Sequence, residues 1–134
     1  MAPSSDLADF YGFDRPETLE GLSGPITLIN HFALREIADD RVGSPERSGL
    51  EAMLLYAAVS TERLAAVGGT FVMQGLHVGS LWGDELPWDL VVVANYPTPD
   101  ALFDLFADEQ YRTAYVHRRA AVERQRVEIC STIS

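Results

Sequence analysis

The sequence predicts an α+β fold whose elements follow one another in the order β-α-β-β-α-β. Three observations support this order. Several apolar segments are rich in β-branched residues, which is typical of strands. The segments between them carry apolar residues at helical spacing. Helix-capping residues, Ser48 and Thr98, stand where the two main helical segments begin.

The first residues differ in character from the rest of the chain. Residues 1–24 contain Pro, Gly and scattered aromatic residues, so we expect a loosely structured arm with one short helix near residues 4–10. The aromatic side chains of this arm are expected to pack on a single domain that comprises residues 25–134.

The first strand and helix follow the arm. The segment 26–34, Ile-Thr-Leu-Ile-Asn-His-Phe-Ala-Leu, predicts a central strand whose alternation places Asn30 on one face and His31 on the other. Ser48 and Glu51 form an S-x-x-E capping box at the start of a helix. The Gly-Gly pair at the end of that segment predicts where the helix stops.

The second half of the chain supplies the remaining elements. Residues 70–82 and 88–96 predict two strands that are joined by a Gly-Asp-Glu-Leu-Pro turn. The alternation of the first of them places Phe71, Met73, Gly75 and His77 on one face. Thr98 is followed by proline, a favourable start for a helix, and Asp108 begins a further helical segment. Residues 124–133 predict the last strand.

This succession of elements is the ferredoxin-like pattern. We expect an antiparallel sheet in the strand order 4-1-3-2, with both helices on one face. The apolar residues on the other face would then be uncovered, and a patch of that size indicates a partner surface. A second copy of the chain covers it most simply, so we expect a homodimer.

Composition excludes several classes of function. The chain has 134 residues, 47% of them hydrophobic, and a formal net charge of −10, which argues against nucleic acid or an anionic membrane surface as a partner. No apolar run approaches the ~20 residues of a membrane span, and the N-terminus lacks signal-peptide character, so we expect a cytoplasmic protein.

The single Cys130 excludes a multi-cysteine metal site and is expected to be buried.

Three stretches of the sequence resemble a known family. They are GPITLINHF, GGTFVMQG and WDLVVVANYPTPDALFDLFADEQYRTAYVHRRAA, and the match as a whole covers about residues 24–130. They are similar to the DUF1330-type branch of the dimeric α+β barrel superfamily, and the resemblance implies that fold. His31 and the arm depart from the pattern. The superfamily includes cofactor-free monooxygenases, isomerases and haem enzymes, whereas this branch has no agreed reaction.

Three residues are candidates for catalysis. His117 lies on the helix side that carries Ala114 and Ala121, so we expect it to point inward, with Arg118 at the flank of the helix and Arg119 toward solvent. An inward imidazole is either a general acid/base or a hydrogen-bonded core residue. Asn30 and Tyr56, also predicted to face inward, could hold a ligand oxygen or could serve the core alone.

Further residues are candidates for contacting a substrate: His31, Met73, Trp82, Trp88, Tyr96 and Arg118. For the two tryptophans the alternative is packing of the hairpin, and His31 is expected to face the dimer interface. The three histidines lack the spacing of a metal site, so no metal or other cofactor is predicted.

Two hypotheses of function follow. The first is a cofactor-independent enzyme of biosynthesis that acts on a hydrophobic, polyketide-like small molecule. Proton transfer by His117 would lead to isomerisation, cyclisation or oxygenation. The second is a non-catalytic dimeric domain that binds a ligand or serves as a scaffold. Small residues at Ala57, Ser60, Gly75, Ala120 and Ala121 leave room for a cavity between helices and sheet, and they equally permit close packing.

Overall fold

A single antiparallel sheet organises the chain. The computed structural model describes residues 5–39 and 46–133. The strands are β1 (Ile26–Leu34), β2 (Thr70–Leu76), β3 (Leu90–Tyr96) and β4 (Val122–Ser131), and the helical elements are α1 (Ser5–Tyr11), the 3-10 turn η1 (Pro16–Leu19), α2 (Gly49–Ala66), α3 (Pro99–Ala107) and α4 (Glu109–Ala121). The strand order β2-β3-β1-β4 confirms the predicted ferredoxin-like topology.

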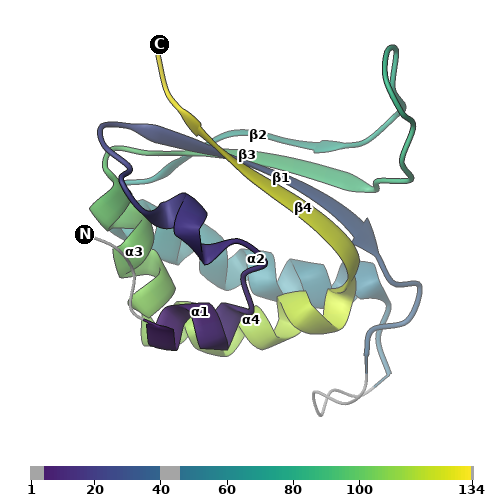
Figure 1. Cartoon of the computed structure of the whole chain (residues 1–134). Helices are drawn as coiled ribbons and strands as arrows, with labels where there is room; N and C mark the ends of the chain where they lie inside the picture. Colours follow the sequence, from purple (N-terminus) through teal and green to yellow (C-terminus); the bar gives the residue numbers. More distant parts are fainter. Residues whose placement is uncertain (1–4, 40–45, 134) are drawn as a thin grey trace.

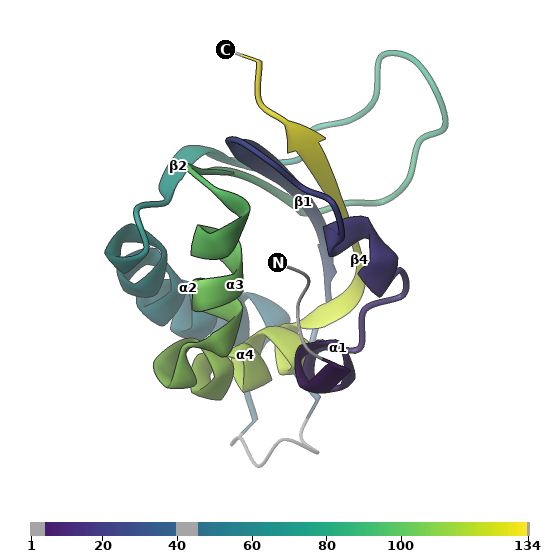
Figure 2. The same cartoon turned by 60° about the vertical axis from the view of Figure 1, so that its left-hand side comes forward.

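The helices all lie on one side of this sheet (Figures 1 and 2). β1 is central and pairs with both β3 and β4. Its inner residues Ile26, Leu28 and Phe32 are buried against the helices. Within the described residues, no helix is both long enough and apolar enough to cross a membrane.

The predicted helix starts are confirmed. Ser48 and Glu51 bond reciprocally through side chain and backbone, which completes the capping box of α2. The hydroxyl of Thr98 accepts from the backbone N–H of Ala101 at the start of α3. Asp108 caps α4, and its carboxylate also pairs with Arg63 of α2 across 2.8 Å, so one residue joins the two long helices.

The hairpin between β2 and β3 is longer than predicted. β2 ends at Leu76 and β3 begins at Leu90, so both strands are shorter than the sequence indicated. The intervening loop projects from the end of the sheet (Figure 1). Trp82 in this loop is 87% exposed.

A β-bulge in β2 changes which side chains face the helices. Phe71 pairs with Ala94, but Met73 pairs with the next residue of β3, Val93, so Val72 is an extra residue. An extra residue breaks the alternation of a strand and moves every later side chain to the opposite face.

The predicted faces of β2 are therefore wrong beyond the bulge. Met73 and Gly75 were expected on the same face as Phe71. Instead Gln74 and Leu76 share the inner face with Phe71, and all three line the cavity described below. The bulge is invisible in the sequence of β2 because it is defined by pairing with β3.

β4 forms an edge of the sheet. Cys130 on this strand is exposed, although the sequence predicted a buried residue. It pairs with Thr27 of β1, on the face away from the helices, where the described chain offers no covering element.

The N-terminal arm lies against the helices. The Tyr11 hydroxyl donates a hydrogen bond of 2.6 Å to the backbone oxygen of Phe106 at the end of α3. The guanidinium of Arg112 lies 4.4 Å from the ring centre of Phe10, and Arg119 donates to the Phe10 backbone oxygen. The short helix predicted near residues 4–10 is α1; residue 4 itself lies outside the described residues.

Candidate functional site

A cavity of about 900 Å³ lies between the helices and the inner face of the sheet. This volume is in the upper part of the range of about 300–1,000 Å³ that is typical of small-molecule sites. Its walls are mainly apolar and include Leu28, Phe32, Met53, Val92, Ala94 and Leu105. A hollow of this size and lining can hold an apolar molecule with one or two aromatic rings.

α4 contributes the main polar group of the cavity. Tyr111, Tyr115 and Arg118 follow at intervals of four and three residues, so they form one stripe on the helix, and all three line the cavity. Arg118 is only 8% exposed. The structure therefore places a positively charged group inside an apolar space.

The guanidinium of Arg118 is held by two hydrogen bonds. Its Nη1 donates to the hydroxyl of Tyr56 on α2 across 3.1 Å, and its Nη2 donates to Oε1 of Gln125 on β4 across 2.8 Å. Its Nε is buried and has no hydrogen-bond partner among the described residues.

Aromatic rings surround this charge. The guanidinium carbon of Arg118 lies 4.7 Å from the ring centre of Phe32, 5.0 Å from that of Tyr115 and 5.5 Å from that of Tyr56. The negative faces of aromatic rings attract a cation, and this attraction offsets part of the free energy needed to remove the guanidinium from water. A guanidinium stays protonated in proteins, so the charge persists at every physiological pH.

Two tyrosine hydroxyl groups extend the network. The hydroxyl oxygens of Tyr56 and Tyr111 are 2.7 Å apart. Either hydroxyl can donate in this bond. When Tyr111 is the donor, the Tyr56 oxygen accepts from both Tyr111 and Arg118, and the Tyr56 proton is available to a ligand. Burial raises the pKa of Tyr111 well above its ordinary value and, on the cavity wall, also raises that of Tyr96. Both phenols are therefore neutral at physiological pH.

Asn30 lies on the sheet side of the cavity. It is 8% exposed, and its Nδ2 donates to the backbone oxygen of Val92 across 3.1 Å. This bond to the neighbouring strand explains how an asparagine is accommodated in the middle of β1. The side chain lines the cavity, as its inward position predicts.

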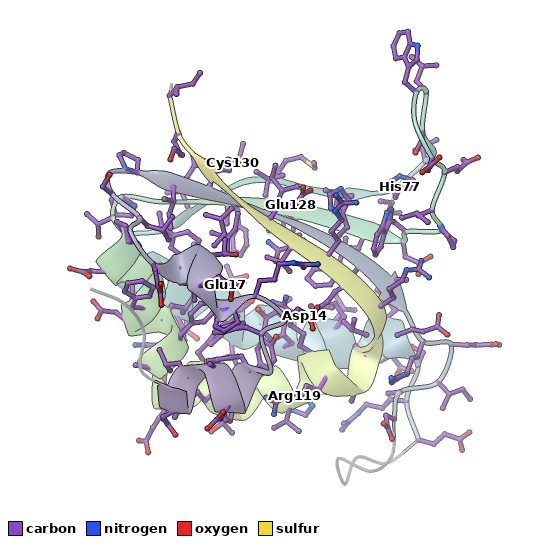
Figure 3. All side chains as sticks on the ribbon, viewed as in Figure 1. Asp14, Glu17, His77, Arg119, Glu128 and Cys130 are labelled. Atoms are coloured by element: carbon purple, nitrogen blue, oxygen red, sulfur yellow. The ribbon has the colours of Figure 1, made fainter. Side chains whose placement is uncertain are left out.

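The remaining charged residues of the lining are exposed. Asp14 and Arg15 come from the arm and belong to the rim, whereas Arg126 and Glu128 come from β4, where they pair with His31 and Ile29 and face outward. Arg126 and Glu128 pair with each other across 3.6 Å. In Figure 3, Asp14 lies on the arm below β4, and Glu128 lies on β4 itself. Asp14 makes no ion pair within the part of the chain that the structure describes.

The predicted inward orientation of His117 is wrong. His117 is half-buried and does not line the cavity, and its buried Nδ1 has no partner among residues 5–39 and 46–133. The helix instead turns Tyr111, Tyr115 and Arg118 inward. Burial of the rings of Tyr111 and Tyr115 removes a large apolar surface from water, which favours this rotation of α4. Arg119 is exposed, as predicted.

The other predicted contact residues divide between the two faces. Tyr96 is buried and lines the cavity. His31 and Trp88 lie against each other with ring centres 5.5 Å apart, and neither lines the cavity. Met73 lies on the outer face because of the bulge, and Trp82 is exposed in the projecting loop. Of these candidates, the structure brings only Tyr96 together with Tyr56, Asn30 and Arg118.

The small residues have mixed positions. Ala57 and Ser60 of α2 line the cavity as expected. Ala120 and Ala121 are fully buried but do not line it, and Gly75 lies on the outer face. The cavity thus depends on the short side chains of α2, and not on the alanines of α4.

Sequence reasoning missed four residues of the site: Asp14, Phe32, Tyr115 and Gln125. For Tyr115 a signal was present, since Tyr111, Tyr115 and Arg118 have the spacing of one helical stripe. Asp14 and Gln125 come from separate segments, and only the folded chain brings them to the cavity.

A family model for a domain of unknown function, DUF1330, matches residues 47–130, more than half of the chain. The chain belongs to the DUF1330 family. The match includes α2, α4 and most of β4, which carry Tyr56, Arg118 and Gln125. The resemblance stated from the sequence is therefore confirmed, and the family description leaves the reaction open.

Solved structures resemble this DUF1330 chain over most of its length. A protein of unknown function from Rhodopseudomonas palustris is 31% identical, with a TM-score of 0.78 and coverage of 98% of this chain and 95% of that one. The methylated form of the same protein is 29% identical, with a TM-score of 0.79 and coverage of 100% and 98%.

A more distant neighbour shows the fold alone. It is a dimeric protein of unknown function with a ferredoxin-like fold from Bacteroides fragilis, 15% identical, with a TM-score of 0.53 and coverage of 81% of this chain and 97% of that one. A comparison of the DUF1330 chain with curated proteins finds no match.

Proposed function

We propose that the cavity binds an apolar, polyketide-like molecule with a ketone oxygen and that the protein catalyses proton transfer at the carbon beside that carbonyl, without a cofactor. The observation that carries the proposal is the hydrogen bond between buried Arg118 and Tyr56 inside an apolar cavity. Such a pair stabilises negative charge that develops on a bound oxygen, and it does so most strongly where water is excluded.

Tyr56 is the proposed donor to the ketone oxygen. Its oxygen accepts a hydrogen bond from the charged Arg118, which draws electron density away from the O–H bond and makes the hydroxyl a stronger donor. Asn30 on the opposite wall helps to orient the substrate.

Asp14 is the proposed base. Of the two acidic residues in the described lining, Glu128 lies opposite Ile29 on the outer face of the sheet and pairs with Arg126, which leaves the carboxylate of Asp14. In the proposed step, the Asp14 carboxylate takes a proton from the carbon beside the carbonyl. The C–H electron pair forms a carbon–carbon double bond, and the ketone oxygen becomes an enolate oxygen that Tyr56 stabilises. In a substrate with a double bond between the β and γ carbons, this enolate is conjugated, and return of the proton to the γ carbon shifts the double bond and completes an isomerisation.

His117, the base expected from the sequence, has no part in this mechanism because it lies outside the cavity lining. A biosynthetic origin of the substrate and a cytoplasmic location of the reaction stay predictions from the sequence.

Hydrogen–deuterium exchange tests the proposal directly. The probe is 4-oxo-4-phenylbutanoate, an aryl ketone with exchangeable hydrogens beside its carbonyl, followed by proton NMR in D₂O. We expect the protein to accelerate exchange at that carbon above the buffer rate, and Asp14→Asn to abolish the acceleration. Exchange at the buffer rate with wild-type protein would contradict the catalytic proposal.

Ligand binding without catalysis is the second candidate function. It is favoured by the hydrogen bonds that Tyr56 and Gln125 already form with Arg118, because a network that is satisfied in this way can serve recognition alone. Binding of the probe with no accelerated exchange would support this alternative.

We also propose that a second copy covers the outer face of the sheet. Ile29, Val91 and Val93 are only half-buried there, and Met73 is 44% exposed. These residues form an apolar surface over three strands, which is typical of a partner site. The dimeric ferredoxin-like neighbour from Bacteroides fragilis is consistent with a homodimer.

A further inference from the structure

We infer that the ligand of the cavity is an apolar monocarboxylate whose carboxylate binds Arg118. The inference rests on the small-molecule site proposed above and deepens it by naming the charge of the ligand. It depends on the pairing and burial of Arg118, and not on the catalytic step.

Arg118 is the one buried arginine among the described residues, and like the exposed Arg119 and Arg124 it has no acidic partner there. Arg63 pairs with Asp108, Arg112 with Asp6, and Arg126 with Glu128. Arg118 makes no ion pair within the described residues, although the chain contains 20 acidic residues against 10 basic ones.

The burial of Arg118 makes the absence of an acidic partner significant. The side chains of Arg112 and Arg126 are 25% and 60% exposed, so water can solvate their charge, whereas Arg118 is 8% exposed. A buried charge without a counter-ion is unfavourable, and aromatic rings and neutral oxygens compensate only in part. A carboxylate supplied by a ligand would complete the ion pair.

The geometry of the guanidinium provides a place for that carboxylate. Nε is a buried donor with no partner among the described residues. Nε and Nη2 form one edge of the guanidinium, and this edge matches the two oxygens of a carboxylate. Nη2 bonds to Gln125, whose exposed position on β4 lets its side chain give way. Nη1 keeps its bond to Tyr56.

The residues around Arg118 favour a ligand that carries a single negative charge on an otherwise apolar molecule. The other charged lining residues are exposed: Asp14 and Arg15 on the rim, and Arg126 and Glu128 on the outward side of β4. Among the described lining residues, Arg118 is thus the one buried cation. A ligand with a second carboxylate would place that group against apolar walls, where its desolvation is uncompensated.

A matched pair of probes tests this inference. Isothermal titration calorimetry would compare 4-oxo-4-phenylbutanoate with its amide, which has the same shape and no charge. We expect the wild-type protein to bind the acid at least roughly tenfold more tightly, because hydrogen bonds to a charged group are the stronger ones. In Arg118→Gln, the ratio of the affinity for the acid to the affinity for the amide should fall to about one.

The control is Arg124→Gln. Arg124 is exposed on the outer face of β4, where it contacts Trp88 and the backbone oxygen of Pro87, so this variant should keep the preference for the acid. The comparison of acid with amide in the wild-type protein is independent of whether Arg118→Gln folds, which circular dichroism would check.

Three results would overturn the inference: equal affinity of the wild type for acid and amide, an unchanged preference in folded Arg118→Gln, or no binding of the acid at millimolar concentration. Preferential binding of the acid without accelerated hydrogen exchange would support the inference and contradict the catalytic proposal. Equal acceleration of exchange on acid and amide would support the catalytic proposal and contradict the inference of a carboxylate ligand.

Discussion

Nη1 of Arg118 on α4 donates a hydrogen bond of 3.1 Å to the hydroxyl of Tyr56 on α2. The two residues are 62 positions apart in the sequence, and they meet because α2 and α4 pack along each other, with the ion pair of Arg63 and Asp108 at the start of α4. The bond places a charged donor and a phenol on one wall of an apolar cavity, and the proposed chemistry depends on it.

The hydroxyl of Tyr56 is expected to be essential for proton transfer. Tyr56→Phe removes the donor to the substrate oxygen and should lower the rate of hydrogen exchange by about 100-fold, the typical effect of losing one oxyanion donor. His117→Gln should leave the rate unchanged because His117 does not line the cavity. A rate that fell in His117→Gln and persisted in Tyr56→Phe would contradict the proposed assignment of roles.

Burial of Tyr11 predicts a loss of stability at alkaline pH. Burial raises the pKa of this hydroxyl from 10.0 to about 12, although Arg112 acts in the opposite direction. The folded state therefore retains a proton that the unfolded chain loses above pH 10.0. Stability is fully present below that pH and falls as the pH rises toward about 12.

Urea denaturation at about pH 8 and about pH 11 would measure this loss. Tyr11→Phe lacks the ionising group and should lose less stability between the two values, while it forfeits about 1 kcal/mol at the lower pH with its hydrogen bond to Phe106. An equal loss in variant and wild type would show that Tyr11 is not responsible.

Asp108 is expected to matter for stability more than other surface acids. Asp108→Ala removes the cap of α4 and the ion pair with Arg63, so the free energy of unfolding should fall by about 1–2 kcal/mol. Asp100→Ala, in the first turn of α3, is the control and should have a smaller effect. Equal effects of the two substitutions would contradict the proposed role of the cap.

The pH dependence of Asp108 has the opposite sign to that of Tyr11. Burial tends to raise the pKa of its carboxyl, but hydrogen bonds from the backbone of Tyr111 and from Arg63 outweigh that effect, and the net result is a pKa below 3.8. Its contribution is present above this value and is lost as the pH falls through the lowered pKa.

The outer face of the sheet should control the oligomeric state. Val93 lies in the middle of β3 opposite Ile29 of β1 and Met73 of β2. Val93→Glu would place a charge at the centre of the proposed interface and should shift a dimer to a monomer in sedimentation experiments at micromolar concentration. Ala58→Glu, exposed on α2, should leave the dimer intact. A wild-type monomer would contradict the dimer proposal.

The sequence by itself determined the order of the elements and the helix starts. Capping by Ser48, Thr98 and Asp108 and the alternation in β1 depend on residues close together in the chain, so they can be read from local patterns. For the same reason Asn30 and Tyr56 were placed on the inner side. The apolar pattern that indicated four strands and their covering helices was sufficient for the topology.

Only the tertiary structure decided which residues meet in the cavity. The rotation of α4 that turns Arg118 inward reflects the burial of whole aromatic rings against the sheet and α2, a sum over contacts that no local spacing contains. The bulge at Val72 depends on the register with β3. Arginine is seldom fully buried, so the surroundings of Arg118 had to be seen before its role could be inferred.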